Sequence, residues 1–354
     1  ATRWAVLAEL GVTALLVPEV HGGLGLTELE LVGVLEEAGW AGVPEPLAET
    51  AALAAPLLAD AGRLAPEGAA AHPVVERCLP AIAAGALVAT VGGVDPVTGG
   101  VNSATAAAGE DGGSDGAGSA GGSASAEGTV VTPRVVGAVR AGLLLLASSA
   151  PATGWQIHAV EPDEAWVTAT PSIDGTRDLG TVGWIPSAHT VVASGHHAEA
   201  LVGNLVDRAA VASAAQLLGL ADRMITLAAD YARERKQFGK PIGSFQAVKH
   251  HLANARVRLE FARPATYRAA NSLAQGLPDR SEHASMAKAL ASDAADLAAR
   301  VALQVHGAIG YTWECDLHLF MKRAWTLSAA WGDATTHRAR VLSAAVARSS
   351  ERLG

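Results

Sequence analysis

Apolar residues recur at intervals of three and four from residue 201 to residue 354, and this spacing predicts long amphipathic helices. We expect five of them, at 207–235, 245–273, 282–306, 316–330 and 334–352. The links between them are short, which favours antiparallel neighbours in a bundle. Pro264 should kink the second helix. Asp207 and Asp333 stand where N-caps are expected for the first and last helices.

Residues 1–88 also show helical spacing, with a glycine-rich turn near 22–25. Thr27 followed by Glu30 predicts a capping box at the start of the helix after that turn. This part of the chain is therefore predicted to be a helical domain.

The pattern changes between residues 89 and 200. Short segments rich in Val and Thr are separated by Gly, Pro, Asp and Ser, which predicts strands at 87–94, 129–136, 143–147, 155–160 and 165–170. Residues 98–128 are almost wholly small or polar, and we expect a flexible loop because they cannot bury enough apolar surface. The predicted fold is mainly α with a small β domain: an N-terminal helical domain (1–88), a β domain (89–200) and a C-terminal four-helix bundle (201–354).

Composition argues against several classes of function. The 354 residues carry a formal net charge of -9, so nucleic acid is not expected as a partner. Cys78 and Cys315 form no CxxC pair, and we expect no disulfide framework, no metal site and a reducing, cytoplasmic location. The apolar runs are too short to span a bilayer. The histidines show no ligand spacing, and His306 and His318 are interpreted as surface or cap residues.

The most distinctive stretch is residues 231–252, YARERKQFGKPIGSFQAVKHHL. A cluster of cations ends one predicted helix, where cations suit the helix dipole, and Gly239 and Pro241 then break it. Ser244 is a candidate N-cap for the next helix. Taken by itself, the spacing favours a helical hairpin with a basic turn.

The string RKQFGKPIGSFQ at 235–246 resembles the signature of the acyl-CoA dehydrogenase family. In that family the segment lies at a subunit interface and reaches the FAD of a neighbouring subunit. The resemblance implies that Arg235 binds phosphate, for which a guanidinium fork is well suited, and that Gln237, Phe238 and Gln246 surround the same cofactor.

A second segment, QVHGAIGYT at 304–312, resembles the family loop that contacts the adenosine and pyrophosphate end of FAD. This implies cofactor contacts for Gln304, Gly307 and Ala308, although a helix C-cap turn accounts for the glycines equally well. The order of residues 10–25 is similar to the N-terminal domain of the family, and Asp174, Thr176 and Arg177 resemble the D-x-T-R of its β domain. Those last three residues would also suit a simple ordered turn.

Two expected features of the family are missing. Its chemistry needs a carboxylate to take the proton α to the thioester carbonyl. The usual position of that base, counted from Gln304, is occupied by Trp331, which cannot take a proton. The only nearby acids are Asp333 and, in the region where some members carry the base, Asp207. The segment that meets the flavin ring has no counterpart except a Gly-Ser-Asp at 113–115, inside the low-complexity loop.

The leading hypothesis is a subunit of a heterotetrameric (α2β2) FAD-dependent acyl-CoA dehydrogenase that completes the cofactor site of a catalytic partner. Its substrate would be an acyl-CoA, with a steroid side chain suggested by the heteromeric pattern, and its electron acceptor an electron-transferring flavoprotein. Two alternatives stay open: a self-sufficient homotetrameric dehydrogenase using Asp207 or Asp333, and a helical scaffold without cofactor.

Overall fold

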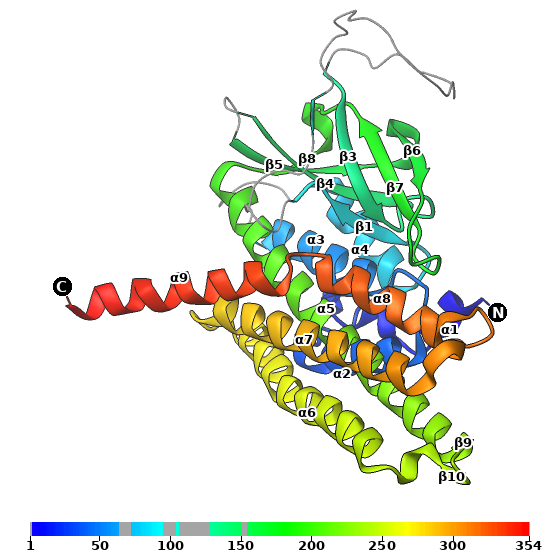
Figure 1. Cartoon of the computed structure of the whole chain (residues 1–354). Coiled ribbons are helices and arrows are strands. Elements are labelled where there is room, and N and C mark those ends of the chain that lie inside the picture. Colours follow the sequence, from blue (N-terminus) through cyan, green and yellow to red (C-terminus); the bar gives the residue numbers. More distant parts are fainter. Residues whose placement is uncertain (1, 64–71, 95–103, 106–127, 151–153, 354) are drawn as a thin grey trace, which may run out of the picture.

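The computed structural model describes residues 2–63, 72–94, 104–105, 128–150 and 154–353. Figure 1 shows two small sheets at one end of the molecule, the N-terminal helices beside them, and the long C-terminal helices at the other end. This arrangement matches the predicted fold class. The predicted loop at 98–128, with its Gly-Ser-Asp at 113–115, lies mostly outside the described residues.

The N-terminal region is helical, as predicted. It consists of α1 (Arg3–Glu9), α2 (Glu28–Ala41), α3 (Ala55–Arg63) and α4 (Pro73–Ala83), with the short helical turns η1 (Val12–Ala14) and η2 (Glu19–His21) and the π-helical η3 (Ala48–Ala54). The predicted capping box is present at the start of α2, where the backbone N–H of Thr27 donates to Glu30 at 2.8 Å.

The strands form two four-stranded sheets. One has the order β1 (Ala89–Gly92), β4 (Leu143–Ala150), β5 (Gly154–Val160), β8 (Val191–Ser194), and the other β2 (Ala104–Thr105), β3 (Val130–Val136), β7 (Leu179–Trp184), β6 (Ala165–Thr170). β1 pairs with β4 in parallel and the other pairs are antiparallel. The turns η4 (Pro162–Glu164) and η5 (Ala188–Thr190) follow β5 and precede β8.

Strand β4 explains how the sheets join the helices. Successive side chains of a strand point to opposite faces of its sheet. Leu143 and Leu145 accordingly enter the large core shared with the helices, whereas Leu144 and Leu146 enter a smaller core between the two sheets that also holds Trp184. A run of four leucines is therefore buried on both faces, and this strand fixes the β domain to the helical body.

All five helices predicted for the C-terminal region are present. They are α5 (Gly195–Glu234), α6 (Gln246–Ala274), α7 (Arg280–His306), α8 (Leu317–Ala329) and α9 (Ala334–Leu353). α6 continues through Pro264. The predicted start of the first helix is wrong, because α5 begins at Gly195 and Asp207 lies inside it rather than at its N-cap. The residues before Asp207 are helical because Leu201 and Leu205 bury against the core.

Two glycines let α2 and α5 approach closely. A Cβ atom on Gly39 would lie 2.2 Å from the carbonyl oxygen of Gln216, and one on Gly219 would lie 1.9 Å from that of Glu36. Each helix thus meets the backbone of the other where any larger residue would clash.

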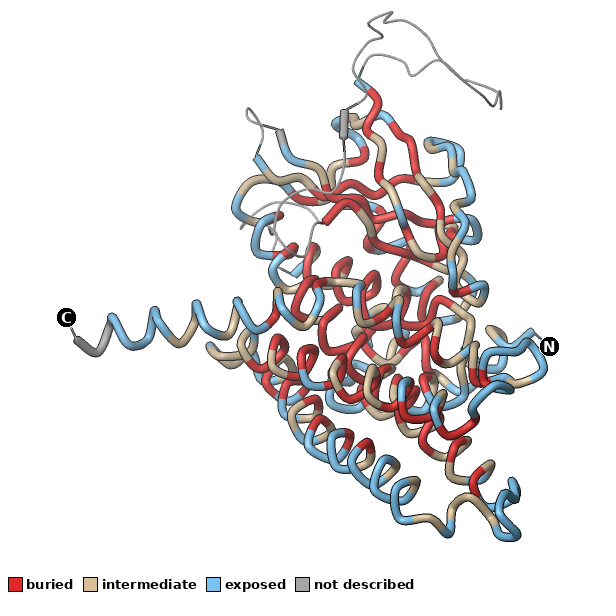
Figure 2. Tube along the Cα trace, in the orientation of Figure 1, coloured by how far each residue is buried: buried red, intermediate tan, exposed pale blue. Residues whose placement is uncertain are grey.

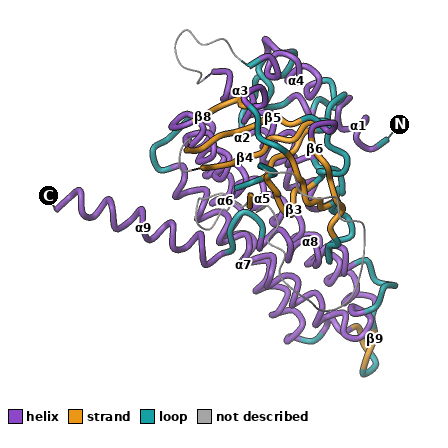
Figure 3. Tube along the Cα trace, turned by 90° about the horizontal axis from the view of Figure 1, so that it is seen from above, coloured by secondary structure: helices purple, strands orange, loops and turns teal. Residues whose placement is uncertain are grey.

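The last helix, α9, extends away from the body of the molecule in both views (Figures 1 and 3). Figure 2 shows buried residues gathered inside the bundle and the sheets, while the far half of α9 is almost wholly exposed or half-buried.

Candidate functional site

The first signature, 235–246, forms a short hairpin between α5 and α6. Strands β9 (Lys236–Gln237) and β10 (Lys240–Pro241) pair across Phe238 and Gly239, whose φ angles are 54° and 79°. This is a turn in which Asn-Gly is preferred, so a phenylalanine at its first position is strained. The predicted cap is wrong: Ser244 belongs to the turn η6 (Ile242–Ser244) and donates to the carbonyl of Pro241 at 2.7 Å, while Phe245 occupies the N-cap of α6.

The hairpin carries cations and an exposed ring. Phe238 is 89% exposed, and Lys240 lies over the ring of Phe245 with its Nζ 4.5 Å from the centroid. Within the described part of the chain, Arg235, Lys236 and Lys240 have no carboxylate within ion-pair distance. Three cations without acidic partners in a chain of net charge -9 make this hairpin locally positive, which suits an anion such as a pyrophosphate.

The second signature, 304–312, lies next to the first. α7 ends at His306, Gly307 takes a positive φ of 63° as its C-cap, and η7 (Gly307–Tyr311) follows. The ring of His306 stacks on Tyr231, near the end of α5, with 4.6 Å between centroids, and its Nδ1 donates to the carbonyl of Ala302 at 2.8 Å. His306 is therefore not a surface residue, because it is buried against Tyr231, but it does occupy the N-cap of η7, as the alternative of a cap residue predicted.

The residues expected to contact the cofactor share one property, which is that all of them are exposed. They are Arg235, Gln237, Phe238, Gln246, Gln304, Gly307 and Ala308. A side chain that must reach a cofactor held by another subunit has to lie on the outside of its own chain. Their donor set, one guanidinium, three amides and the backbone N–H groups of a glycine turn, fits a phosphate-bearing group.

An aromatic cavity adjoins the second signature and was not foreseen from the sequence. It has a volume of about 250 Å³ and is lined by residues of η7, of α8 (Leu317–Ala329) and of the segment between them, among them Tyr311, Trp313, Met321 and Trp325. The Nζ of Lys322 lies 4.0 Å from the ring of Trp313. The aromatic residues are separated by irregular backbone, so no periodicity in the sequence announces the cavity.

Trp331, which the sequence count predicts at the position of the base, lies in a turn that buried side chains hold in place. Trp331 has a φ of 58° and packs against the main core. Lys288, fully buried in α7, donates from Nζ to the carbonyls of Ser328 and Gly332, both at 2.9 Å. Burial lowers the pKa of Lys288 to about 7, opposed by the negative charge of Asp333.

A buried histidine completes this support. His337 is fully buried, and burial lowers its pKa to about 4. Its neutral ring donates from Nε2 to the carbonyl of Trp331 at 2.9 Å. The turn 330–333, in which the sequence count predicts Trp331 at the position of the base, is thus fixed by side chains from α7 and α9.

The two acids considered as substitutes are engaged elsewhere. Asp207 is buried, accepts from Ser281, and is paired with Arg340 of α9 at 2.9 Å. Asp333 accepts from the backbone N–H of Thr336 at 2.8 Å and from its hydroxyl, which confirms it as the cap of α9. These hydrogen bonds lower the pKa of Asp333. Both carboxylates therefore already have hydrogen-bonding partners within the chain.

The segment that resembles the D-x-T-R of the family joins three parts of the chain. Asp174 accepts from the backbone N–H of Thr176 at 3.0 Å, which confirms an ordered turn. Arg323 of α8 donates to Asp174 and, at 3.2 Å, to the carbonyl of Val43 after α2. Arg177 pairs with Glu49, and burial lowers the pKa of Arg177. Their role is the attachment of the β domain to the helices.

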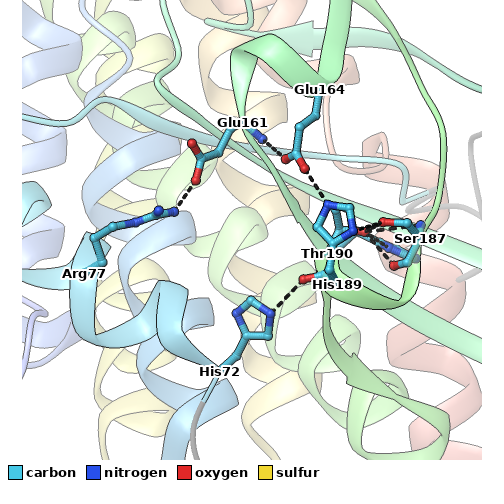
Figure 4. Close-up of polar contacts among 8 residues, drawn as sticks. His72, Arg77, Glu161, Glu164, Ser187, His189 and Thr190 are labelled. Carbon is cyan, nitrogen blue, oxygen red and sulfur yellow. Dashed lines mark hydrogen bonds and ion pairs between the residues drawn. The ribbon is translucent and has the colours of Figure 1, made fainter.

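A chain of polar contacts between the β domain and α4 includes a hydroxyl, an imidazole and a carboxylate (Figure 4). His189 contacts Ser187 Oγ through Nδ1 at 2.8 Å and Glu164 through Nε2 at 2.6 Å. The sequence of contacts from hydroxyl to imidazole to carboxylate resembles that of an activated nucleophile. The His189 side chain is 73% exposed, however, and Ser187 is engaged as the cap of η5. His72, the N-cap of α4, donates to the carbonyl of His189 at 3.0 Å. We interpret the cluster as structural.

Two classes of site are absent from the described residues. No helix among them has the length and apolar character needed to cross a membrane. Nor does any group of three or more His, Cys, Asp and Glu residues within the described ranges come together as metal ligands would.

Comparison with known proteins identifies close relatives. A family model described as acyl-CoA dehydrogenase, C-terminal domain, matches residues 200–346. The chain is 31% identical over 323 residues to acyl-CoA dehydrogenase IpdE2 of Mycolicibacterium smegmatis, covering 91% of this chain and 80% of that protein. It is 33% identical over 356 residues to acyl-CoA dehydrogenase FadE34 of Mycobacterium tuberculosis, covering 99% of this chain but only 43% of that relative.

Solved structures share the fold. The steroid ACAD Tcur3481-Tcur3483 superposes with a TM-score of 0.79 at 26% identity, covering 98% of this chain and 89% of that one. Two further structures show the common fold alone. The ChsE4-ChsE5 complex from Mycobacterium tuberculosis has a TM-score of 0.76 at 24% identity, covering 96% and 86% of the two chains. Butyryl-CoA dehydrogenase from Megasphaera elsdenii has a TM-score of 0.77 at 21% identity, covering 97% and 89%.

Proposed function

The chain belongs to the acyl-CoA dehydrogenase family, and on that premise we propose that it is the non-catalytic subunit of a heteromeric, FAD-dependent member. In this role it completes the cofactor site of a catalytic partner, and the partner supplies the base. The enzyme as a whole would dehydrogenate an acyl-CoA thioester between its α and β carbons.

The observation that carries the proposal is Trp331. A general base must lie within hydrogen-bond reach of the proton it removes. In this chain the turn presents an indole, and Lys288 and His337 hold the backbone of that turn in place. Loss of the base alone would need only one substitution. Here Lys288 and His337 also stabilise the turn that carries Trp331, so the turn is built around a residue that cannot act as a base.

The alternative of a self-sufficient enzyme would use Asp207 or Asp333 as the base. Asp207 is buried and would have to leave its ion pair with Arg340, whose side chain is 32% exposed, and a hydrogen bond to a charged group contributes about 1.5–3 kcal/mol. Asp333 would have to give up its cap on α9, which costs about 1 kcal/mol. These losses favour the heteromeric proposal.

The residues of the two signatures suit the proposed cofactor. Arg235 would bind phosphate, Gln237, Gln246 and Gln304 would donate amide hydrogen bonds, and Gly307 with Ala308 would offer backbone N–H groups. Phe238 would cover the cofactor with its exposed ring, which gives a reason for its strained backbone. FAD, when bound, supplies the acceptor for the hydride that leaves the β carbon.

The relatives suggest partners and substrate. One structural neighbour is the steroid ACAD Tcur3481-Tcur3483, which supports a two-subunit enzyme and a CoA thioester of a steroid side chain. We propose an α2β2 assembly with an electron-transferring flavoprotein as acceptor.

The deciding experiment is the visible spectrum of this chain, purified alone and after co-expression with the catalytic dehydrogenase subunit proposed as its partner. We expect flavin absorbance only in the co-expressed complex. Stoichiometric flavin and acyl-CoA turnover in the lone chain would contradict the proposal and favour a self-sufficient enzyme.

A pair of variants separates cofactor binding from a cofactor-free scaffold. Arg235→Ala in the co-expressed complex should weaken FAD binding at least tenfold, since a hydrogen bond to a charged group contributes about 1.5–3 kcal/mol. Arg233→Ala is the matched control, because Arg233 is exposed on the same turn and pairs with Asp230. A colourless parent complex would favour the cofactor-free scaffold. So would equal flavin content in the Arg235→Ala and Arg233→Ala complexes, because Arg235 would then play no part in binding FAD.

A further inference from the structure

The aromatic cavity beside the second signature has one wall from a helix and another from the segment that precedes it. The helix is α8, whose lining positions are 318, 321, 322 and 325. Residues at this spacing lie on one face of a helix. The other wall is formed by residues 310–313, where the hydroxyl of Thr312 donates to the carbonyl of Ile309 at 2.8 Å. Both walls are therefore held by hydrogen bonds of their own.

Three aromatic side chains of the cavity are open to solvent. Tyr311 and Trp313 are each 78% exposed, and Trp325 is 42% exposed. Exposed apolar rings that gather at a cavity mark a place where another molecule binds. His318 packs edge-on against the ring of Trp313, with 4.7 Å between centroids. An indole fixed in this way offers a flat surface on which a second ring can stack.

The cavity is suited to an anion. Its lining contains Lys322 and no carboxylate. The Nζ of Lys322 lies 4.0 Å from the centroid of the Trp313 ring, and among the described residues no carboxylate lies within ion-pair distance of it. This ammonium would repel a cationic ligand, whereas an anionic group would accept a charge-assisted hydrogen bond from it. The ligand that fits is therefore a flat ring with an anionic group attached.

We propose that the aromatic cavity binds the adenine of a nucleotide, with the base against the indoles of Trp313 and Trp325 and a phosphate near Lys322. Bases stack on aromatic side chains because every base has a π-face. The volume of about 250 Å³ lies just below the range of about 300–1,000 Å³ for pockets that enclose whole drug-sized ligands, which suits a single ring system.

The position of the cavity agrees with this ligand. Leu303 and Gly310 line it, and they flank residues 304–308, which are proposed above to meet a pyrophosphate. Two molecules of the proposed reaction, FAD and CoA, carry an adenine next to a pyrophosphate. The choice between these two sources rests on the proposed function, whereas the nucleotide site itself stands on the cavity. Trp313 and Trp325 lie outside both signatures, so the inference adds binding residues that neither signature contains.

The first test titrates the lone chain, carrying isotope-labelled tryptophan, with AMP and follows the indole N–H resonances by NMR. The resonances of Trp313 and Trp325 should shift saturably. The resonance of Trp166 on β6, which is 43% exposed and so matches Trp325, should not shift. Ribose 5-phosphate lacks the base and should leave all three unchanged. The absence of saturable shifts at Trp313 and Trp325 would overturn the proposal.

Three variants test the role of each group. Trp325→Leu should raise the dissociation constant for AMP about fivefold or more, which is the lower end of the contribution of one stacking ring. Trp166→Leu is the matched control and should leave that constant unchanged. Lys322→Met should weaken the binding of AMP but not of adenosine, which has no phosphate. The circular dichroism of each variant should match that of the parent, and parent-like binding of AMP by Trp325→Leu would contradict the stacking.

The co-expressed complex with the catalytic subunit distinguishes the two sources of the adenine. With FAD as the source, Trp325→Leu should release flavin more readily and leave the KM for the acyl-CoA unchanged. With CoA as the source, the KM should rise about fivefold or more while the flavin content stays constant. A Trp325→Leu complex that is unchanged in both properties would overturn the proposal.

Failure of this inference is distinguishable from failure of the proposed function. Saturable AMP binding by a chain whose co-expressed complex never holds flavin would refute the cofactor role and leave the nucleotide site standing. A complex that holds flavin, formed by a chain whose Trp313 and Trp325 resonances do not respond to AMP, would refute the nucleotide site and leave the cofactor role standing.

Discussion

A buried ammonium lies beneath the turn that carries Trp331. The Nζ of Lys288 donates to two carbonyls at the end of α8 and just after it, where the helix leaves acceptors without intrahelical partners. Desolvation of the cation opposes this arrangement, and its lowered pKa expresses the cost. The net effect of Lys288 on stability is the gain from its two hydrogen bonds less the cost of desolvating its ammonium group.

We expect Lys288→Met to destabilise the chain by about 1–3 kcal/mol, because the carbonyls of Ser328 and Gly332 would stay buried without a donor. Urea unfolding followed by circular dichroism measures the change. Lys249→Met, at an exposed position of α6, is the control and should change stability by less than about 0.5 kcal/mol. A more stable Lys288→Met would mean that the cost of burying the ammonium dominates.

Two buried histidines make stability depend on pH. Burial lowers the pKa of His158 and of His337 from 6.5 to about 4. Between those values the unfolded chain binds protons that the folded chain does not, so stability falls as the pH is lowered from 6.5 towards 4. His158→Gln should remove up to about 3 kcal/mol of this loss relative to the parent, measured by urea unfolding at pH 7 and at pH 4.5.

The control for this pH dependence is His196→Gln, whose side chain is fully exposed. It should leave the difference in stability between the two pH values unchanged. An identical pH dependence of the His158→Gln variant and the parent would show that His158 is not held neutral.

Single residues were predictable where a local rule decides them. The Asp333 cap and the capping box of Thr27 follow from residue type and spacing alone, and both are present. The burial of His306 was not, because it depends on Tyr231 of another helix. Nor was the pairing of the buried Asp207 with Arg340, which joins residues far apart in the sequence.

At the scale of elements, the crossing of α2 and α5 depends on two glycines. Gly39 and Gly219 lie where each helix meets the backbone of the other. A glycine inside a helix costs about 1 kcal/mol relative to alanine, so the close approach has to compensate for it. The crossing also places α5, whose end leads into the first signature.

Gly219→Ala should destabilise the chain by about 2 kcal/mol or more, because its Cβ would lie 1.9 Å from a backbone oxygen and the helices would have to separate. Gly203→Ala in the same helix is the opposite case, since its Cβ would have no atom within 4 Å, and it should stabilise by up to about 1 kcal/mol. Thermal unfolding of the two variants measures both effects. Equal shifts for the two would contradict the steric argument.

The elements themselves were largely predictable. The helices of the bundle follow from apolar spacing, and each was expected in the sequence. β7 (Leu179–Trp184) was missed because Gly180 and Gly183 interrupt its pattern. Packing between strands accounts for Gly183, because a Cβ on it would lie 2.2 Å from the ring of Trp166 on β6. β8 (Val191–Ser194) was also missed.

At the scale of the whole molecule, Arg323 joins the β domain to both helical regions. It is buried, and its partners are Asp174 after β6, Thr176 at 2.5 Å, and the carbonyl of Val43. Such a group cannot be inferred from sequence, because its members come from three separate segments. Removing one member leaves an uncompensated charge in a dry environment.

We expect Asp174→Asn to lower stability by about 3–5 kcal/mol and to speed proteolysis between the β domain and the helices. Asp178→Asn is the control in the same turn, since Asp178 pairs with Arg140 at the surface, and it should cost less than about 1 kcal/mol. Thermal unfolding and limited proteolysis measure the two variants together. Equal behaviour would mean that the buried pair does not hold the domains.

The exposure of the seven residues predicted to meet the cofactor also affects how the protein behaves on dilution. On the proposed function, flavin affinity belongs to the assembled complex and obeys mass action. Dilution below the dissociation constant of the subunits then releases flavin while each chain stays folded. In a cell, the number of working flavin sites is set by the scarcer of two gene products, and surplus copies of this chain remain colourless.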